Sequence, residues 1–178
     1  MPTKTITSYE VLGQSIAPVA NVPYITQGAF LQISNLENAA ARVNILYIGT
    51  PPFVAASGAV SLFTNYIDQT GLANATSYPV ADFLAAPVGF KGLTIPGKST
   101  WLFGVQYLLA PGAAVPAVGV DARGFIQLEA AHGSKLLVLA TTRQVFTNFS
   151  SDGPPGTVTD VSESAYAVPL QGGPEVIF

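Results

Sequence analysis

Short stretches of alternating apolar and polar residues recur along the chain, while helical spacing of apolar residues is almost absent. Alternation with a period of two is typical of β-strands that bury one face. Residues 29–35 place Leu31 and Ile33 on one side of such a strand and polar or aromatic neighbours on the other. Residues 41–48 alternate in the same way, and we expect the strand to end at the Gly-Thr-Pro-Pro sequence that follows, because proline cannot donate to a ladder.

Two hairpins are predicted from short connections between such stretches. The five-residue segment 35–39 is short enough to join 29–35 to 41–48 as neighbouring strands. Residues 90–95 and 99–109 flank Pro-Gly-Lys at 96–98, with proline second and glycine third, the arrangement that a type II turn favours. This second pair is the clearest local hairpin signal in the sequence.

The remaining strand signals complete an all-β pattern. The run at 135–146 begins with continuous apolar residues, which predicts burial on both faces at its centre. The terminal Val-Ile-Phe predicts a buried end that completes a sheet. Other strands are expected at 5–11, 123–129 and near 164–170. His132 and Gly133 are expected in the turn that joins 123–129 to 135–146. We predict one domain over 1–178, an antiparallel β-sandwich of the immunoglobulin-like or jelly-roll kind with seven to nine strands.

Two segments carry weaker signals. Residues 49–92 are rich in alanine and proline and are expected to be a loop-rich excursion, with a strand at 59–64, turns at 65–74 and one helical turn at 80–86. A second Pro/Gly/Ala connection spans 111–120 and is too apolar for a solvated linker. We expect both excursions to pack on a neighbouring molecule.

Composition narrows the class of partner. Charged residues make up 10% of the chain, against about 25% in an ordinary soluble protein, so part of the surface is expected to be covered by other copies. The seven basic residues are scattered and the net charge is −3, which disfavours nucleic acid. No apolar run reaches the length of a spanning helix, and the first residues lack the apolar core of a signal peptide. We therefore expect a soluble chain with no membrane insertion and no signal peptide.

The sequence offers little material for catalysis. With no cysteine and His132 as the sole histidine, zinc and blue-copper sites cannot be assembled from one chain. A serine nucleophile would need that same histidine, and no Gly-x-Ser-x-Gly sequence is present to position it, which disfavours a serine hydrolase. No glycine-rich phosphate loop is present. We predict that the chain is not an enzyme and needs no cofactor. A weak Ca²⁺ site is conceivable at Asp152, Asp160 and Glu163, although their spacing is not that of an EF-hand and a solvated loop explains them as well.

Aromatic residues fall into two groups. Trp101, Phe103 and Tyr107 occupy alternate positions of one expected strand, which favours the core over a sugar-stacking surface. The rings of Tyr66, Tyr78 and Phe83 lie in the weak central stretch and are the candidates for an exposed contact surface.

Two functions from different classes remain. The first is a non-enzymatic structural protein, a β-sandwich that associates with itself or with a host lattice as a capsid, decoration, coat or filament subunit, and an extracellular or virion assembly fits that role. The second is a carbohydrate-binding or adhesive module that uses Tyr66, Tyr78, Trp101 or the 152–163 loop, with or without Ca²⁺. The likeness to sandwich proteins is one of fold only, and fold does not fix function.

Overall fold

The computed structural model describes residues 1–15, 24–54, 61–107, 119–149 and 158–178, and in this part of the chain eleven antiparallel strands and one short helix form. The prediction of an all-β antiparallel fold is confirmed, and the strand number exceeds the seven to nine expected. The elements are β1 (Thr3–Ser15), β2 (Tyr24–Asn35), β3 (Ala41–Val54), β4 (Ser61–Ile67), β5 (Ala73–Pro79), α1 (Val80–Ala85), β6 (Val88–Ile95), β7 (Thr100–Gln106), β8 (Val120–Ala130), β9 (Lys135–Phe149), β10 (Val158–Val168) and β11 (Glu175–Ile177).

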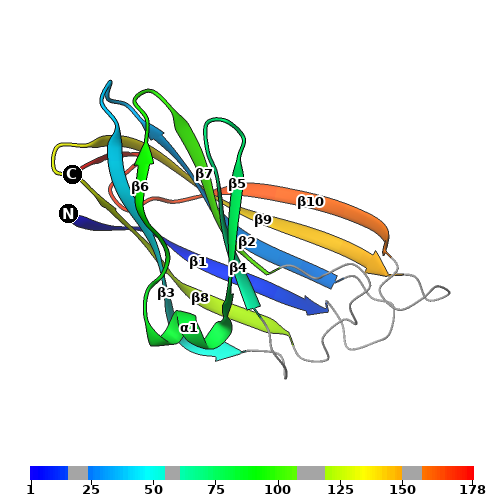
Figure 1. Ribbon diagram of the computed structural model, residues 1–178. Helices are drawn as coiled ribbons and strands as arrows, with labels where there is room; N and C mark the ends of the chain where they lie inside the picture. The colour runs from blue at the N-terminus through cyan, green and yellow to red at the C-terminus, as the bar shows by residue number, and fades with distance from the viewer. Residues whose placement is uncertain (16–23, 55–60, 108–118, 150–157) are drawn as a thin grey trace.

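Strand β2 is the branch point of the sheet (Figure 1). One edge of β2 pairs with β9 along its whole length. The other edge pairs with β1 over residues 24–27 and with β7 over residues 28–34. Two runs of strands therefore leave β2, one in the order β7-β4-β5 and the other in the order β1-β8-β3-β6, while β10 and β11 continue the sheet beyond β9.

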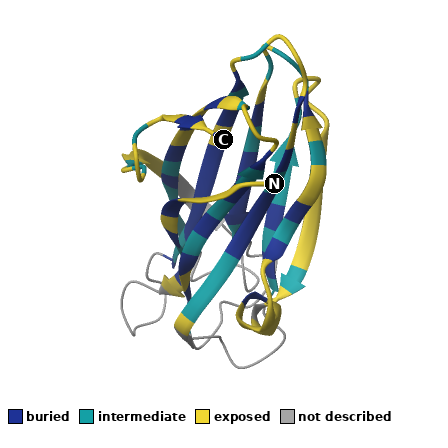
Figure 2. Cartoon of the chain, turned by 90° about the vertical axis from the view of Figure 1, so that its left-hand side faces the viewer, coloured by how far each residue is buried: buried dark blue, intermediate teal, exposed yellow. Residues whose placement is uncertain are grey.

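The core lies between the two runs. Every second residue of β8 is buried, from Val120 through Leu128 to Ala130, and these side chains meet Leu31 and Phe103 from the other run in one hydrophobic cluster. The bands of buried and exposed residues along the strands follow this alternation (Figure 2). Alternation of this kind is what the period-two sequence pattern predicts for strands with one buried face.

Neither predicted hairpin forms. Strand β3 pairs with β8 and β6 and not with β2, so the first hairpin is absent. Strand β7 pairs with β2 and β4 and not with β6, so the second is absent as well. The connections 36–40 and 96–99 instead cross from one run to the other side by side. Asn35 fastens them together, because its backbone N–H donates to Ser99 O (2.9 Å) and its side chain donates to Ala39 O (2.8 Å) and Ile95 O (3.1 Å).

The expected Pro-Gly-Lys turn is shifted by one residue. Ser99 N donates to Pro96 O (3.3 Å), so the turn spans 96–99 and Lys98, not Gly97, takes the left-handed conformation with φ of 59°. Glycine is required at 97 for space, since a Cβ there would lie 2.0 Å from Asn38 O. The sequence pattern located this turn but misplaced it by one residue, so that the positive φ falls on Lys98 and not on Gly97.

Residues 49–92 are more regular than the expected loop-rich excursion. Strand β3 continues past Pro51 and Pro52 with a register shift between Thr50 and Val54, and β4, β5, α1 and the start of β6 follow. The helical turn is confirmed, while 65–74 holds the end of β4 and the start of β5 around a turn at Asp68. The connection predicted at 111–120 lies almost wholly outside the described residues.

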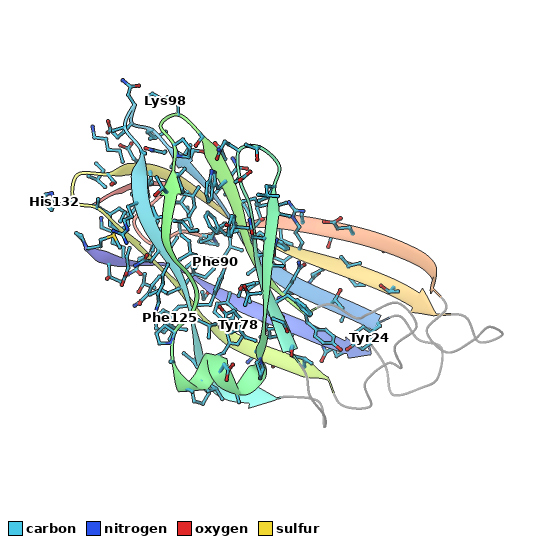
Figure 3. The ribbon with its side chains drawn as sticks, viewed as in Figure 1. Tyr24, Tyr78, Phe90, Lys98, Phe125 and His132 are labelled. Carbon is cyan, nitrogen blue, oxygen red and sulfur yellow. The ribbon has the colours of Figure 1, made fainter. Side chains whose placement is uncertain are left out.

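The C-terminal part completes the sheet as expected. Strand β11 pairs with β9, and Val176 and Phe178 are buried, whereas Ile177 between them is half exposed. At the same end of β9, the turn before Lys135 carries His132 outward into solvent (Figure 3). Within the described residues, no helix is long and apolar enough to cross a membrane.

Candidate interaction surface

One side of the β5-β4-β7-β2-β9 run faces outward, and its residues follow from the pairing register. Leu31 lies opposite Phe103 and both side chains are fully buried, so the residues that alternate with them point away from the core. We call this outward surface the neutral face. It consists of every second residue, counted from the first one named, in 28–34, 63–67, 73–77, 100–106 and 137–143.

The neutral face carries a single charged side chain, Arg143, among its described residues. The guanidinium carbon of Arg143 lies 4.8 Å from the ring centroid of Phe30, and Nη1 lies 3.9 Å from Oε1 of Glu163 in β10. The Phe30 ring in turn covers Gly104, where an added Cβ would come within 2.7 Å of the ring. The one charge is therefore held over an aromatic ring and beside an acid.

Apolar side chains are exposed on this face. Leu137 is 41% exposed and Leu139 is 46% exposed, while Leu136 and Val138 between and beside them are buried. The predicted burial of the 135–146 run on both faces is therefore wrong, because no element of the described chain covers its outer side. In the register, Leu139 lies in one row with Leu102 and Ile67 across the sheet.

The outward side of β1, β8 and β3 differs sharply, because it gathers the charges. Arg123 donates from Nε to Glu10 Oε1 (2.8 Å) and pairs through Nη2 with Asp121 Oδ2 (2.9 Å), and these acids raise the pKa of Arg123. The network continues through Gln27, which donates to Glu10 Oε2 (3.2 Å). We call this side the charged face. Its charged residues are Glu10, Arg42, Asp121, Arg123 and Glu129.

A shallow groove of about 490 Å³ lies on the charged-face side, beside Phe125 (Figure 3). Its far wall is the chain after β10, held in place where Thr7 Oγ1 donates to Pro169 O (3.2 Å) and Gln171 N donates to Ile6 O (3.0 Å). The lining carries hydroxyl and amide groups and no charge. The other lining residues are Thr5, Ser8 and Val168.

The aromatic row of β7 belongs to the core, as predicted. Trp101 is 8% exposed, stacks on Tyr66 with centroids 5.3 Å apart, and donates from Nε1 to Gln69 Oε1. Tyr66 also meets Phe90 edge to face at 4.9 Å, in the middle of the molecule (Figure 3). Trp101 therefore offers no open ring to a sugar.

The rings proposed for an exposed contact surface pack inward instead. Phe83 is 1% exposed, because α1 turns it into the core, and this leaves it no area for a partner. Tyr78 meets Phe83 edge to face at 6.0 Å and its hydroxyl donates to Gly89 O (3.4 Å). Tyr66 and Tyr78 are half-buried and pack against the core. The candidate interaction surface is therefore the neutral face, where Leu137 and Leu139 are exposed, and not these rings.

The acidic candidates are not brought together in the described residues. Asp152 lies outside the described part of the chain, and the side chain of Asp160, which stands opposite Asn148 in the β10–β9 pairing, lies outside it as well. Glu163 faces Arg143. Where side chains are described, no three acidic or histidine residues gather in a way that could hold a metal ion.

Two buried tyrosines form a feature that the sequence did not reveal. Tyr9 and Tyr47 meet edge to face with centroids 6.1 Å apart, and neither hydroxyl has a hydrogen-bond partner. Burial raises the pKa of both phenols well above the usual value, and in Tyr47 the neighbouring Tyr9 adds to the rise. They sit between β1 and β3, away from both outward faces.

No protein-family model matches the sequence, and no curated protein matches it either.

Proposed function

We propose that this chain is a non-enzymatic structural subunit that associates with copies of itself through the neutral face, in an assembly of the coat, capsid, decoration or filament type. The segregation of charge carries the proposal. Five charged residues lie outward on one side of the molecule, whereas the neutral face carries Arg143 alone among its described positions, with Lys135 and Glu163 at its margin. A surface from which charge is excluded is typical of the centre of a protein interface.

The layout of the strands supports this use of the face. We propose that the two runs form the two layers of a sandwich, with β5-β4-β7-β2-β9-β10 in one layer and β1-β8-β3-β6 in the other. Such layers share a core on their inner sides and leave two outer sides free. The outer side of the first layer is the neutral face, and the outer side of the second is the charged face.

The size of the neutral face also matters. Five strands about 4.8 Å apart and about seven residues long give a planar area of about 550 Å². A standard interface buries about 800 Å² on each partner, and contacts below about 1,000 Å² in total are seldom stable. Two neutral faces packed together would bury about 1,100 Å². This is enough for association and places the contact at the weak end of the range.

Leu139→Glu tests the proposal, because it puts a carboxylate in the middle of the neutral face at a half-exposed position where the isolated fold tolerates it. Face-to-face packing would bury that charge against an apolar neighbour, so the dissociation constant should rise tenfold or more. Thr5→Glu is the matched control, since it adds the same charge at an exposed position on the charged-face side. Sedimentation velocity of both variants and the parent measures the shift. Equal shifts in both variants would refute the proposal.

Glycan binding is a second candidate, and the groove beside Phe125 is the observation that favours it. An aromatic ring with hydroxyl and amide groups around it is the chemistry that neutral sugars require. Titration calorimetry with a panel of neutral oligosaccharides tests it, with Phe125→Ala as the variant. Heat that is the same in both proteins, or absent from both, would dismiss this function.

A further inference from the structure

Strand β10 forms an open edge of the sheet. It pairs with β9 along one side, and among the described residues no strand pairs with its other side (Figure 1). Such an edge presents a row of backbone N–H and C=O groups that another strand can pair. The opposite end of the sheet is less open, because α1 and β6 follow β5 directly and Tyr78 of β5 bonds to Gly89 of β6.

Burial within the chain does not explain why β10 is a strand. All six residues of 162–167 are exposed, on both faces of the sheet, and Tyr166 among them is 48% exposed. Strands normally gain their stability from a buried face, and a strand without one is marginal in water. Ser162, Ser164 and Ala165 are small, so an approaching strand meets no bulky side chain here. Lysine and proline, which commonly protect edges, are absent from 158–168.

We propose that β10 pairs antiparallel with β10 of a second copy of this chain, about a twofold axis at Ala165. Symmetry requires one residue to stand opposite its own copy. Residues opposite each other in an antiparallel pair point to the same face of the sheet, and a twofold axis normal to the sheet keeps each side chain on its face. The axis must therefore pass between the two copies of one residue. At Ala165 that residue is small and central in the exposed stretch. Glu163 then stands opposite Ala167 and not opposite its own copy, which avoids a like-charge pair.

Area is the reason for choosing a second copy as the partner, and here the inference rests on the proposed function. A twofold axis normal to the sheet places the two neutral faces on the same side, flanking the paired β10 strands, because Ala165 shares its face with Arg143; Glu163 of each copy, 3.9 Å from Arg143, also lies on this side. A dimer linked through β10 presents two neutral faces of about 550 Å² each, or about 1,100 Å² in total. This exceeds the roughly 800 Å² that each partner contributes to a standard interface. The edge contact thus turns a weak face-to-face contact into a stable one. Two kinds of twofold axis in one molecule generate a closed ring or an open filament.

A cysteine scan tests the edge contact, since the chain has no cysteine of its own. Ala165→Cys places one thiol on the proposed axis, where the two Cα atoms would lie about 4.5 to 5.5 Å apart, within reach of a disulfide. Oxidation with diamide should convert most of this variant to a covalent dimer on a denaturing gel. Thr5→Cys, exposed on the charged-face side, gives the rate of random collision. Ser164→Cys should cross-link much less than Ala165→Cys, because Ser164 stands opposite Tyr166 and its two copies are diagonal neighbours about 7 to 8 Å apart.

The outcomes separate the two proposals. If the parent protein associates and Ala165→Cys cross-links no faster than Thr5→Cys, the β10 pairing is refuted and association through the neutral face stands. If the parent protein is a monomer at every concentration, both proposals fail. Ala165→Pro and Ser164→Pro form a second pair of variants. The N–H groups of neighbouring residues point to opposite edges of the strand, so one proline removes a bond to β9 and the other removes a bond across the proposed contact. One of the two should keep the parent's melting temperature and lose association, and association that survives in both would overturn the pairing.

Discussion

Asn35 holds together the two connections that cross between the runs of strands, and replacing it should cost the fold several kcal/mol. Its side chain is buried, with Nδ2 donating to Ala39 O (2.8 Å), Ile95 O (3.1 Å) and Pro96 O (3.2 Å), and Oδ1 accepting from Glu37 N (3.0 Å). The amide has two hydrogens for three carbonyls, so the set amounts to two donated bonds and one accepted bond.

Asn35→Ala removes these bonds and leaves buried carbonyl groups without donors. Three bonds at about 1 kcal/mol each, with about 1 kcal/mol more for the unpaired carbonyls, give a loss of about 4 kcal/mol. In a chain of this size such a loss lowers the melting temperature by about 10 °C. Urea unfolding and calorimetry measure both quantities. Asn38→Ala is the matched control, since Asn38 is exposed in the same connection and should change stability by less than about 0.5 kcal/mol.

Asn35→Asp separates lost hydrogen bonds from lost packing, because the two side chains have nearly the same shape. An ionised carboxylate cannot donate to any of the three carbonyls, whereas a protonated one can donate to one of them. The fold therefore favours the neutral acid, so the penalty is largest well above the unfolded pKa of about 3.9 and shrinks as the pH falls toward it. A loss below about 1 kcal/mol in Asn35→Ala, or a loss in Asn35→Asp that does not depend on pH, would refute this account of the crossing.

Three further predictions concern the turns and the core. Gly97→Ala should destabilise the fold by more than Gly71→Ala, because its Cβ would lie 2.0 Å from Asn38 O, whereas a Cβ at Gly71 meets nothing within 4 Å and adds only the strain of a φ of 82°; urea unfolding compares them. Tyr47→Phe should leave stability unchanged or raise it slightly, since the hydroxyl it removes is buried without a partner, and thermal melting checks this. Because burial raises the pKa of Tyr9 and Tyr47, the stability they confer is present below about pH 10 and is lost as the pH rises further; ultraviolet titration should show both phenols ionising only as the protein unfolds.

The sequence pattern predicted the long central strands well because each of them buries one face and the period-two signal depends only on that local fact, whereas β5, which buries neither face, was not predicted. It paired them wrongly because pairing is set at a distance. The 35–39 and 96–99 segments look like hairpin loops, yet the buried amide of Asn35 binds them to each other and sends their strands to different partners. Nothing in the sequence around either turn encodes that contact.

The candidate surface was missed for a related reason. The run beginning at Lys135 fits burial on both faces and fits a strand with leucines outward equally well, and only the absence of a covering element over Leu137 and Leu139 decides between them. The segregation of charge depends in turn on which strands pair with each other. Low overall charge was visible in the composition, while the location of the uncharged part of the surface required the register.

Absolute mass by light scattering behind a sizing column, across a hundredfold range of protein concentration, tests the central claim most directly. Association through the neutral face predicts a mass that rises with concentration above the 18.4 kDa of one chain and that, in Leu139→Glu, rises only at concentrations at least tenfold higher. A mass of one chain throughout the range in the parent protein would contradict the claim that the uncharged side of this molecule is an interface between copies.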